Sequence, residues 1–168
     1  MSAASEELVL AQLGAIGLPF DLIDCDPELA DTAAFCEHYG VPLSHSCNLL
    51  VVKSRRGGER FGACLVRADS KLSNRALRRL LETSKASFAS AEETCAMTGM
   101  MIGGVSAFGL PADMPLWMEA RIRELDYVVV GGGSRSVKVR CGPDLLARLP
   151  NASWVEDLAE PLLQGAGS

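Results

Sequence analysis

Histidine is scarce in this sequence, and several familiar catalytic motifs are absent from it. The 168 residues include only two histidines, His38 and His45. The chain contains no Gly-x-Ser-x-Gly, no His-Glu-x-x-His and no phosphate-binding loop. We therefore do not expect a Ser-His-Asp hydrolase or a metallohydrolase, and we predict neither a metal site nor a cofactor. His38 is expected on the surface of a helix.

Long apolar runs and paired cysteines are also missing. No apolar run approaches the roughly 18 residues that a membrane-spanning helix needs. Residues 1–7 are acidic and lack the basic start of a secretory signal. The six cysteines form no Cys-x-x-Cys pair, which favours reduced, mostly buried thiols over a zinc site or a disulfide framework. The sequence therefore predicts a cytoplasmic protein without a membrane partner.

The composition that is present fits one globular domain. Apolar residues make up 48% of the chain and charged residues 22%, which is too apolar for a disordered protein. A chain of this length can bury roughly 70% of its unfolded surface in one core. We expect a single domain over residues 1–160 and a flexible tail over residues 161–168, where the sequence is small and polar.

Positive charge is concentrated in one segment of an otherwise acidic chain. The net charge is −5, but residues 53–85 hold ten of the sixteen lysines and arginines and carry a net charge of +7. Such a segment can be a solvated face held by salt bridges. The alternative is a surface that contacts the phosphate backbone of a nucleic acid.

Hydrophobic periodicity and turn residues predict an α/β fold. Helices are expected over residues 5–17, 31–40, 75–81, 90–99 and 143–149. Strands are expected over residues 20–24, 48–52, 60–66, 127–130 and 137–141. Ser5 and Asp31 are predicted helix caps, and Ser90 begins a capping box. Residues 56–59 are predicted to turn between two strands of a hairpin, and hairpins mixed with helices favour a mixed sheet over a purely parallel one.

Residues 102–115 form a long apolar segment with three glycines and two prolines. Such a segment cannot be regular structure, and a loop this hydrophobic either lines a binding site or packs on the core. Gly103 and Gly104 would let the backbone approach a ligand closely, and Val105 and Phe108 would supply apolar walls.

A second glycine-rich segment, residues 131–134, lies between two predicted strands. Successive glycines can turn their amides toward an anion. They are equally suited to a tight connection between strands, and the Gly-x-Gly-x-x-Gly pattern of a dinucleotide site is absent.

Six segments in order resemble the YbaK and prolyl-tRNA synthetase editing-domain family, whose members hydrolyse the ester bond of mischarged tRNA. The segments are residues 31–34, 48–52, 87–93, 98–105, 108–111 and 131–136. The resemblance covers nearly the whole chain. It implies a mixed, barrel-like β-sheet flanked by helices, and a pocket for the terminal adenosine and its aminoacyl group. It also implies aminoacyl-tRNA as a partner, with an aminoacyl-tRNA synthetase as a further candidate.

The resemblance suggests roles for individual residues. Cys47 is added as a candidate because a thiolate can act as a nucleophile. The residues expected around the ester are Asn48, Gly103, Gly104, Ser106 and Cys47. The expected substrate-binding residues are Val105, Ala107, Phe108, Gly132, Ser134 and Lys138. The expected tRNA-binding residues are Arg55, Arg56, Arg75, Arg78 and Arg79.

Two positions depart from the family pattern. Members usually carry a lysine directly before a Thr or Asn at the start of a strand, where this chain has Cys47 and Asn48. The family's Gly-x-x-x-Pro loop here ends in Ala107, which predicts a less constrained loop. Cys47 is a candidate nucleophile if its pKa is depressed, with His45 on the same strand face, and an ordinary buried cysteine is the alternative.

We therefore predict a trans-acting aminoacyl-tRNA deacylase that acts on mischarged tRNA carrying a small amino acid. One alternative is a non-catalytic binder of tRNA 3′ ends or aminoacyl nucleotides, because two family positions are changed. A third hypothesis is a small-ester or thioester hydrolase that uses Cys47.

Overall fold

The computed structural model describes residues 2–55 and 60–162, the first three of them by backbone alone. The helices in this part of the chain are α1 (Ser2–Ile16), α2 (Thr32–Tyr39), α3 (Asn74–Leu80), α4 (Ala91–Thr98) and α5 (Pro143–Ala147). The strands are β1 (Phe20–Asp24), β2 (Cys47–Ser54), β3 (Phe61–Arg67), β4 (Ser70–Leu72), β5 (Ala86–Phe88), β6 (Leu116–Glu119), β7 (Val128–Ser134), β8 (Val137–Cys141), β9 (Ala152–Val155) and β10 (Ala159–Pro161). Short 3-10 turns occupy η1 (Pro27–Leu29), η2 (Leu43–His45) and η3 (Ala120–Glu124).

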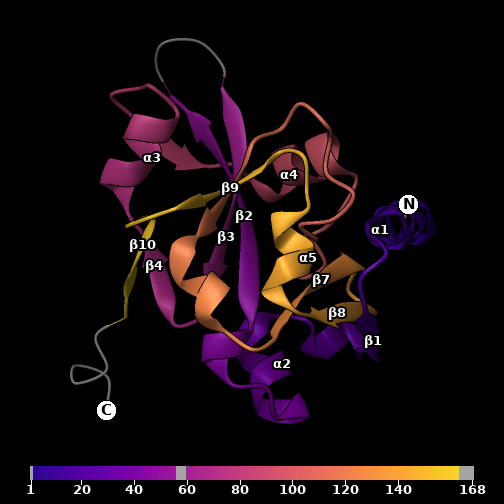
Figure 1. The fold of residues 1–168 in the computed structure, drawn as a ribbon. Coiled ribbons are helices and arrows are strands. Elements are labelled where there is room, and N and C mark those ends of the chain that lie inside the picture. The colour runs from indigo at the N-terminus through magenta and orange to yellow at the C-terminus, as the bar shows by residue number, and fades with distance from the viewer. Residues whose placement is uncertain (1, 56–59, 163–168) are drawn as a thin grey trace.

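The strands form a mixed α/β architecture, as predicted (Figure 1). The largest sheet has the order β5-β2-β3-β6-β9, in which β2 is antiparallel to β3 and β5, while β6 is parallel to β3 and β9. An antiparallel sheet, β1-β8-β7, and a two-stranded sheet, β10-β4, complete the fold. Within the described residues these are three separate sheets, so the expected barrel-like sheet does not close into a barrel.

Strand β2 lies between β5 and β3 in the largest sheet, and both of its faces are buried. Leu49 and Val51 face the main hydrophobic core, whereas Val52 belongs to a second cluster on the other face, against which Leu50 packs. Burial on both faces explains why the strand is a continuous apolar run instead of an alternating one. The predicted hairpin with β3 is confirmed, while its turn at residues 56–59 lies outside the described residues.

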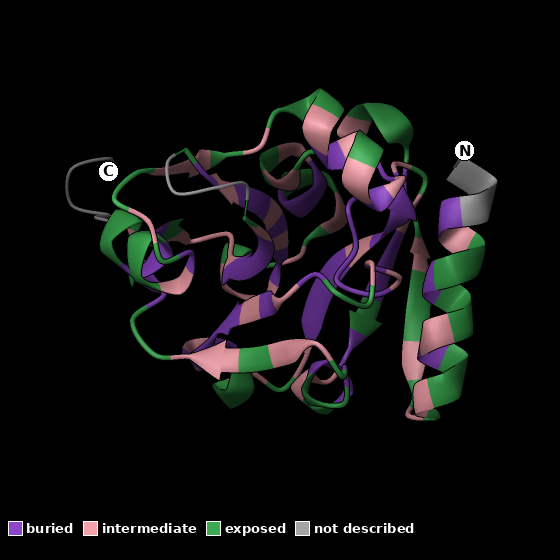
Figure 2. Cartoon of the chain, turned by 90° about the horizontal axis from the view of Figure 1, so that it is seen from above, coloured by how far each residue is buried: buried purple, intermediate pink, exposed green. Residues whose placement is uncertain are grey.

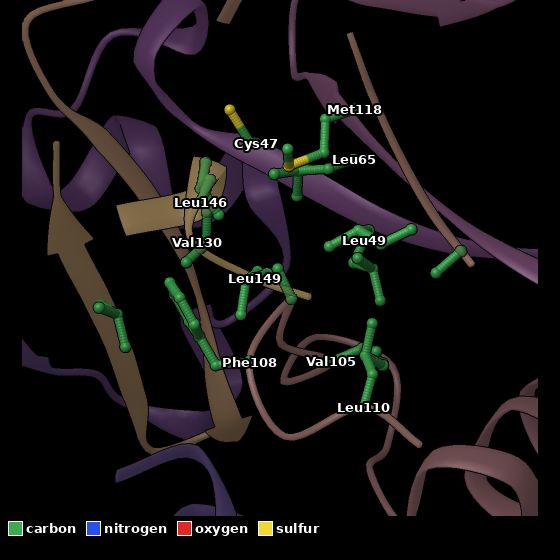
Figure 3. Packing of buried hydrophobic residues seen from close by; sticks show 14 of the residues in the cluster. Cys47, Leu49, Leu65, Val105, Phe108, Leu110, Met118, Val130, Leu146 and Leu149 are labelled. Atoms are coloured by element: carbon green, nitrogen blue, oxygen red, sulfur yellow. The ribbon is translucent and has the colours of Figure 1, made fainter. Parts of the chain in front are cut away.

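The loop between α4 and β6 packs into the main core. Val105, Ala107, Phe108 and Leu110 are all buried in the same cluster as the inner face of β2. Figure 3 shows Phe108 of this loop close to Val130. In Figure 2 the buried residues gather on the inner strands, and the exposed residues lie on the outer sides of the helices. The loop is therefore irregular in backbone but fixed by packing.

The predicted helix caps are partly confirmed. The capping box of α4 is present, since Ser90 Oγ accepts from Glu93 N at 3.0 Å and Glu93 Oε1 accepts from Ser90 N at 2.9 Å. Asp31 occupies the cap position of α2, but its carboxylate makes no capping bond. The prediction for Ser5 was wrong. Helix α1 begins at Ser2, and the Ser5 hydroxyl is buried inside it, where it donates to Gly99 O at 2.6 Å.

The glycine run is part of a strand and does not connect two strands. Residues 131–133 lie inside β7, and the pairing with β8 shifts between Gly131 and Ser134. A Cβ on Gly131 would lie 2.2 Å from Val105 O, so only glycine lets β7 lie this close to the loop. The turn that joins β7 to β8 falls at residues 135–136.

The two ends of the molecule carry different elements. Figure 1 shows α3 at one end of β2 and α2 at the other.

Strand β10 extends to Pro161, one residue into the expected tail, and residues 163–168 lie outside the described part of the chain. No helix formed by the described residues is both long enough and apolar enough to span a bilayer.

Candidate functional site

A cavity of about 230 Å³ opens between the start of α2, the first half of β2, the loop at residue 103 and the β7–β8 hairpin. It brings together five of the residues predicted for the site, which are Cys47, Asn48, Gly103, Val105 and Lys138. Six others do not line it, namely Gly104, Ser106, Ala107, Phe108, Gly132 and Ser134. Asp31 and Lys138 are the charged residues of its lining.

Asn48 presents a polar side chain in this mostly apolar strand. The hydroxyl of Thr32, in the first turn of α2, donates to Asn48 Oδ1. The carbonyl oxygen is thereby occupied, and the Asn48 amide NH₂ has no protein partner among the described residues. Thr32 thus orients Asn48 as a hydrogen-bond donor in the cavity wall. Sequence reasoning assigned no site role to Thr32, although it lies in one of the family-like segments.

The loop turns sharply at Gly103, which has a φ of +91°. Gly104 N donates to Met101 O at 2.9 Å and closes a four-residue turn with Gly103 in its third position. A Cβ on Gly104 would lie 2.4 Å from the backbone of Ser134. Both glycines are therefore required by the backbone path, as their predicted role in close approach implies.

Three consecutive carbonyls of this loop accept hydrogen bonds from the β7–β8 hairpin. Arg135 Nη1 donates to Ile102 O at 2.9 Å, Lys138 Nζ donates to Gly103 O at 2.7 Å, and Gly133 N donates to Gly104 O at 2.9 Å. These bonds constrain the segment in which the family's proline is missing. The sequence carried no signal for them, because the partners are about 30 residues away along the chain.

The amides of Gly103 and Val105 have no hydrogen-bond partner among the described residues, and both residues line the cavity. Ser106 differs, because its amide donates to Met100 Sδ at 3.2 Å and its hydroxyl accepts from Phe108 N at 3.1 Å. Ser106 is also completely buried. The loop thus offers two main-chain donors to a ligand, while the Ser106 side chain stabilises the loop itself.

Lys138 extends from β8 into the cavity wall with only 8% of its surface exposed. Its ammonium donates to Ala30 O at 2.8 Å as well as to Gly103 O, and lies 5.4 Å from the ring centre of Phe35. Burial lowers the pKa of Lys138 from its ordinary value, an effect partly offset by the neighbouring Cys25 and Asp31.

Cys47 lines the cavity but is 5% exposed and belongs to the main core. Burial, with a smaller contribution from Glu119, raises the pKa of the Cys47 thiol far above its ordinary value. His45 is engaged elsewhere, since its Nε2 lies 3.1 Å from Asp126 and its ring stacks on Tyr127 at 4.5 Å. The surroundings of Cys47 thus favour a protonated thiol, and the predicted partner His45 is engaged by Asp126 and Tyr127 instead.

Several predicted substrate-binding residues form a second layer behind the cavity. The Ser134 hydroxyl donates to Glu6 of α1. Gly132 is packed against Val137, where an added Cβ would meet Val137 O at 2.7 Å. Ala107 and Phe108 are within 1% of complete burial. These residues support the shape of the loop and of β7.

The predicted tRNA-binding arginines lie away from the cavity. Arg75, Arg78 and Arg79 are exposed on α3, whose Ala76 and Leu77 face inward. Arg55 is exposed directly after β2, and Arg56 lies outside the described residues. Seven residues of extended chain separate Arg55 from Asn48, a distance of about 23 Å. The cavity and this basic surface are thus at opposite ends of β2.

No metal-binding cluster is found among the residues whose side chains the structure describes: no three His, Cys, Asp or Glu side chains come together there. Five of the six cysteines are buried and Cys95 is partly buried.

The chain matches a known family of proteins that act in translation. The sequence profile of the aminoacyl-tRNA editing domain matches residues 26–149, a span that contains every residue lining the cavity. The chain therefore belongs to the aminoacyl-tRNA editing domain family. The resemblance to YbaK and the prolyl-tRNA synthetase editing domains is confirmed.

Solved structures show the same fold. The crystal structure of a hypothetical protein superposes with a TM-score of 0.80 at 24% identity, covering 90% of this chain and 99% of the other. A candidate trans-editing enzyme for prolyl-tRNA synthetase gives a TM-score of 0.77 at 21% identity, covering 90% of this chain and 95% of the other. A scaffold used for computational epitope grafting gives a TM-score of 0.76 at 21% identity, covering 90% and 96%.

Proposed function

We propose that this chain is a trans-acting deacylase that hydrolyses the ester bond of mischarged tRNA carrying a small amino acid. The observation that carries the proposal is that Gly103 and Val105, whose amides have no hydrogen-bond partner among the described residues, line the same cavity as Asn48. Membership of the editing-domain family supplies the substrate class. The similarity to a candidate trans-editing enzyme supports action as a separate protein.

The chemistry that this wall can support is stabilisation of developing negative charge. Water adds to the ester carbonyl, and the charge that forms on the carbonyl oxygen is stabilised by hydrogen bonds from Gly103 N, Val105 N or the Asn48 amide. The carbon–oxygen bond to the ribose then breaks. The proton lost by the attacking water passes to the departing ribose oxygen, by way of the neighbouring ribose hydroxyl.

This mechanism requires no acidic or basic side chain at the reacting atoms. No histidine or glutamate is among the described residues that line the cavity. The position before Asn48, a lysine in the family, is the buried Cys47, so the reaction would depend on position and dipoles. For this reason we assign Cys47 a packing role in the cavity wall.

The size of the cavity fits a small acyl group. About 230 Å³ must hold the aminoacyl group and part of the ribose, and Phe35, Leu49 and Val130 limit its width. The basic surface formed by Arg55, Arg75, Arg78 and Arg79 would contact tRNA phosphates about 23 Å from the ester. That span would be bridged by the single-stranded 3′ end.

The proposal is tested by incubating the purified chain with tRNAs charged with alanine, serine, threonine, cysteine or proline, and following loss of the ester. We expect selective hydrolysis above the rate in buffer. Replacing Asn48 by Ala should lower kcat about 100-fold, as removal of one charge-stabilising donor typically does. Thr32→Val, which removes only the orienting hydroxyl, should lower it less.

A non-catalytic binder remains the competing hypothesis, because the residues before Asn48 and at Ala107 differ from the family pattern. Saturable, salt-dependent binding of tRNA without loss of any ester would support it and exclude the deacylase. Absence of both hydrolysis and binding would exclude both functions.

A further inference from the structure

Two cations of the β7–β8 hairpin each join the same two walls of the cavity. The first wall is the segment of residues 27–31, which contains η1 and leads into α2. The second wall is the loop of residues 102–104. Arg135 donates from Nε to Pro27 O at 2.9 Å and from Nη1 to Ile102 O at 2.9 Å. Lys138 donates to Ala30 O at 2.8 Å and to Gly103 O at 2.7 Å.

The bonds are arranged in two layers across the opening. Arg135 is the outer bridge, with about a quarter of its side chain exposed, and it also pairs with Asp31 at 3.1 Å. Lys138 is the inner bridge and is almost completely buried. The two walls belong to segments about 70 residues apart in the chain, and both cations form hydrogen bonds to both walls. The hairpin therefore fixes the distance between them.

Burying the Lys138 ammonium at this position has an unfavourable free energy. Its ammonium is desolvated, and in the described part of the chain it donates to two carbonyls and contacts no carboxylate directly. A buried charge without an ion-pair partner is a weak source of stability, and an apolar residue of similar size often stabilises a fold as well or better. Its presence is explained if it holds the walls in position.

We propose that Arg135 and Lys138 are positioning residues that set the width of the cavity, and with it the size of the acyl group that the site admits. This inference rests on the proposed function, since it assigns the basis of size discrimination to the same site. The two bridges take the place of a rigid residue within the loop. They hold the carbonyls of Ile102 and Gly103 toward the hairpin, while the partnerless amides of Gly103 and Val105 remain available at the cavity.

The experiment compares the wild-type chain with Lys138→Met by hydrogen–deuterium exchange and by hydrolysis of alanyl- and leucyl-tRNA. In the variant we expect faster exchange in peptides that cover residues 27–32 and 101–106, because both walls lose a bond. We expect the ratio of kcat/KM for alanyl- over leucyl-tRNA to fall about 10-fold, which is the lower end of the discrimination that one methylene group provides. The melting temperature should stay the same or rise, which would separate positioning from a general loss of structure.

Lys53→Met is the matched control. Lys53 is also a partly buried strand lysine, but its ammonium pairs with Glu93 at 2.8 Å and touches neither wall. It should leave the exchange of both walls and the alanyl-to-leucyl ratio at their wild-type values. Lys138→Arg, which keeps a donor at this position, should retain more of the discrimination than Lys138→Met. Arg135→Met should give a smaller effect in the same direction, since the outer bridge is more solvated.

The outcomes separate this inference from the proposed function. If the wild type hydrolyses none of the alanyl-, seryl-, threonyl-, cysteinyl- and prolyl-tRNAs, the proposed function fails, while the exchange data still decide whether the cations hold the walls. If Lys138→Met leaves the exchange of both walls unchanged, the positioning role is wrong. If exchange rises but the alanyl-to-leucyl ratio does not change, cavity width is not the basis of discrimination and the inference is overturned.

Discussion

The two ends of β2 place their charged groups in different environments. At the cavity end, Lys138 is buried, and the loop carbonyls of Ile102, Gly103 and Gly104 all have hydrogen-bond partners. At the α3 end, the arginines are exposed, and among the described residues Arg60 makes an ion pair with Glu82 at 2.9 Å. Buried groups keep their geometry but tolerate little change, whereas exposed charges attract a partner over distance and tolerate substitution well.

This difference separates the two contributions that the proposed aminoacyl-tRNA deacylase would need. The cavity end would determine how fast a bound ester reacts, because its donors are held in place. The α3 end would determine how tightly and how quickly the RNA binds. Substitutions at the first end should therefore appear in kcat, and substitutions at the second end in KM.

The largest effect is expected from Gly104→Ala. The added methyl group would meet the Ser134 backbone at 2.4 Å, and moving the strand away from the loop would strain the bond between Gly133 N and Gly104 O. We expect kcat for the preferred aminoacyl-tRNA to fall about 100-fold through misplacement of the loop. Urea unfolding should show a loss of about 1–3 kcal/mol in the free energy of unfolding.

Gly14→Ala is the control for this change. Gly14 lies in α1 with open space around the position of an added Cβ. The same substitution there should raise the free energy of unfolding by about 1 kcal/mol, because alanine favours the helix, and should leave kcat unchanged. Equal losses of kcat in both variants would show that the cavity end is not specially constrained.

A smaller effect, in the other parameter, is expected at the α3 end. Replacing Arg75, Arg78 and Arg79 together by Gln should raise KM about 10-fold with little change in kcat, because three exposed cations that face phosphates are lost. The slope of log binding constant against log salt concentration should decrease by about 0.7–0.9 for each lost contact. Arg148→Gln, at an exposed position after α5, should change neither quantity. A fall in kcat at saturating tRNA would contradict the inference that the α3 end affects only binding.

The smallest effect is expected from Cys47→Ala. Burial holds the Cys47 pKa far above its ordinary value, so the thiol stays protonated through neutral and mildly alkaline pH. We expect kcat to change less than about threefold and the free energy of unfolding to fall by about 1 kcal/mol from lost packing. Native-state alkylation of Cys47 should likewise be slow at pH 8. Complete loss of hydrolysis in a folded Cys47→Ala protein would instead make the thiol the nucleophile.

Local sequence signals predicted the elements that depend on local physics. The apolar runs of β2 and β3 and the capping box at Ser90 appear where the sequence predicted them. Strands β4, β5, β6, β9 and β10 were not predicted. All five have only three or four residues and pair with segments distant in the sequence, as β6 does with β3, so no short window contains their signal.

The candidate site was predictable only in part, for a related reason. Gly103 and Gly104 predicted a close approach of the backbone, and the resemblance to the family predicted a site role for Asn48. The contributions of Thr32 and Arg135 depend on distances between segments, which one sequence does not contain. Ser5 and Asp31 were predicted to cap helices because their residue types and positions are typical of caps. Their side chains instead bind distant partners, Gly99 and Arg135.

The close packing of Gly131 against Val105 O has a practical consequence for mapping this protein. Much of the hydrogen bonding around the cavity belongs to peptide groups, which a side-chain survey leaves intact at every position. Systematic alanine scanning would therefore register backbone crowding at the glycines and lost packing at Val105, but it would leave the Val105 amide, one of the proposed donors, in place. Replacing the Val105 peptide bond by an ester through chemical ligation would delete that single N–H and leave the side chains untouched.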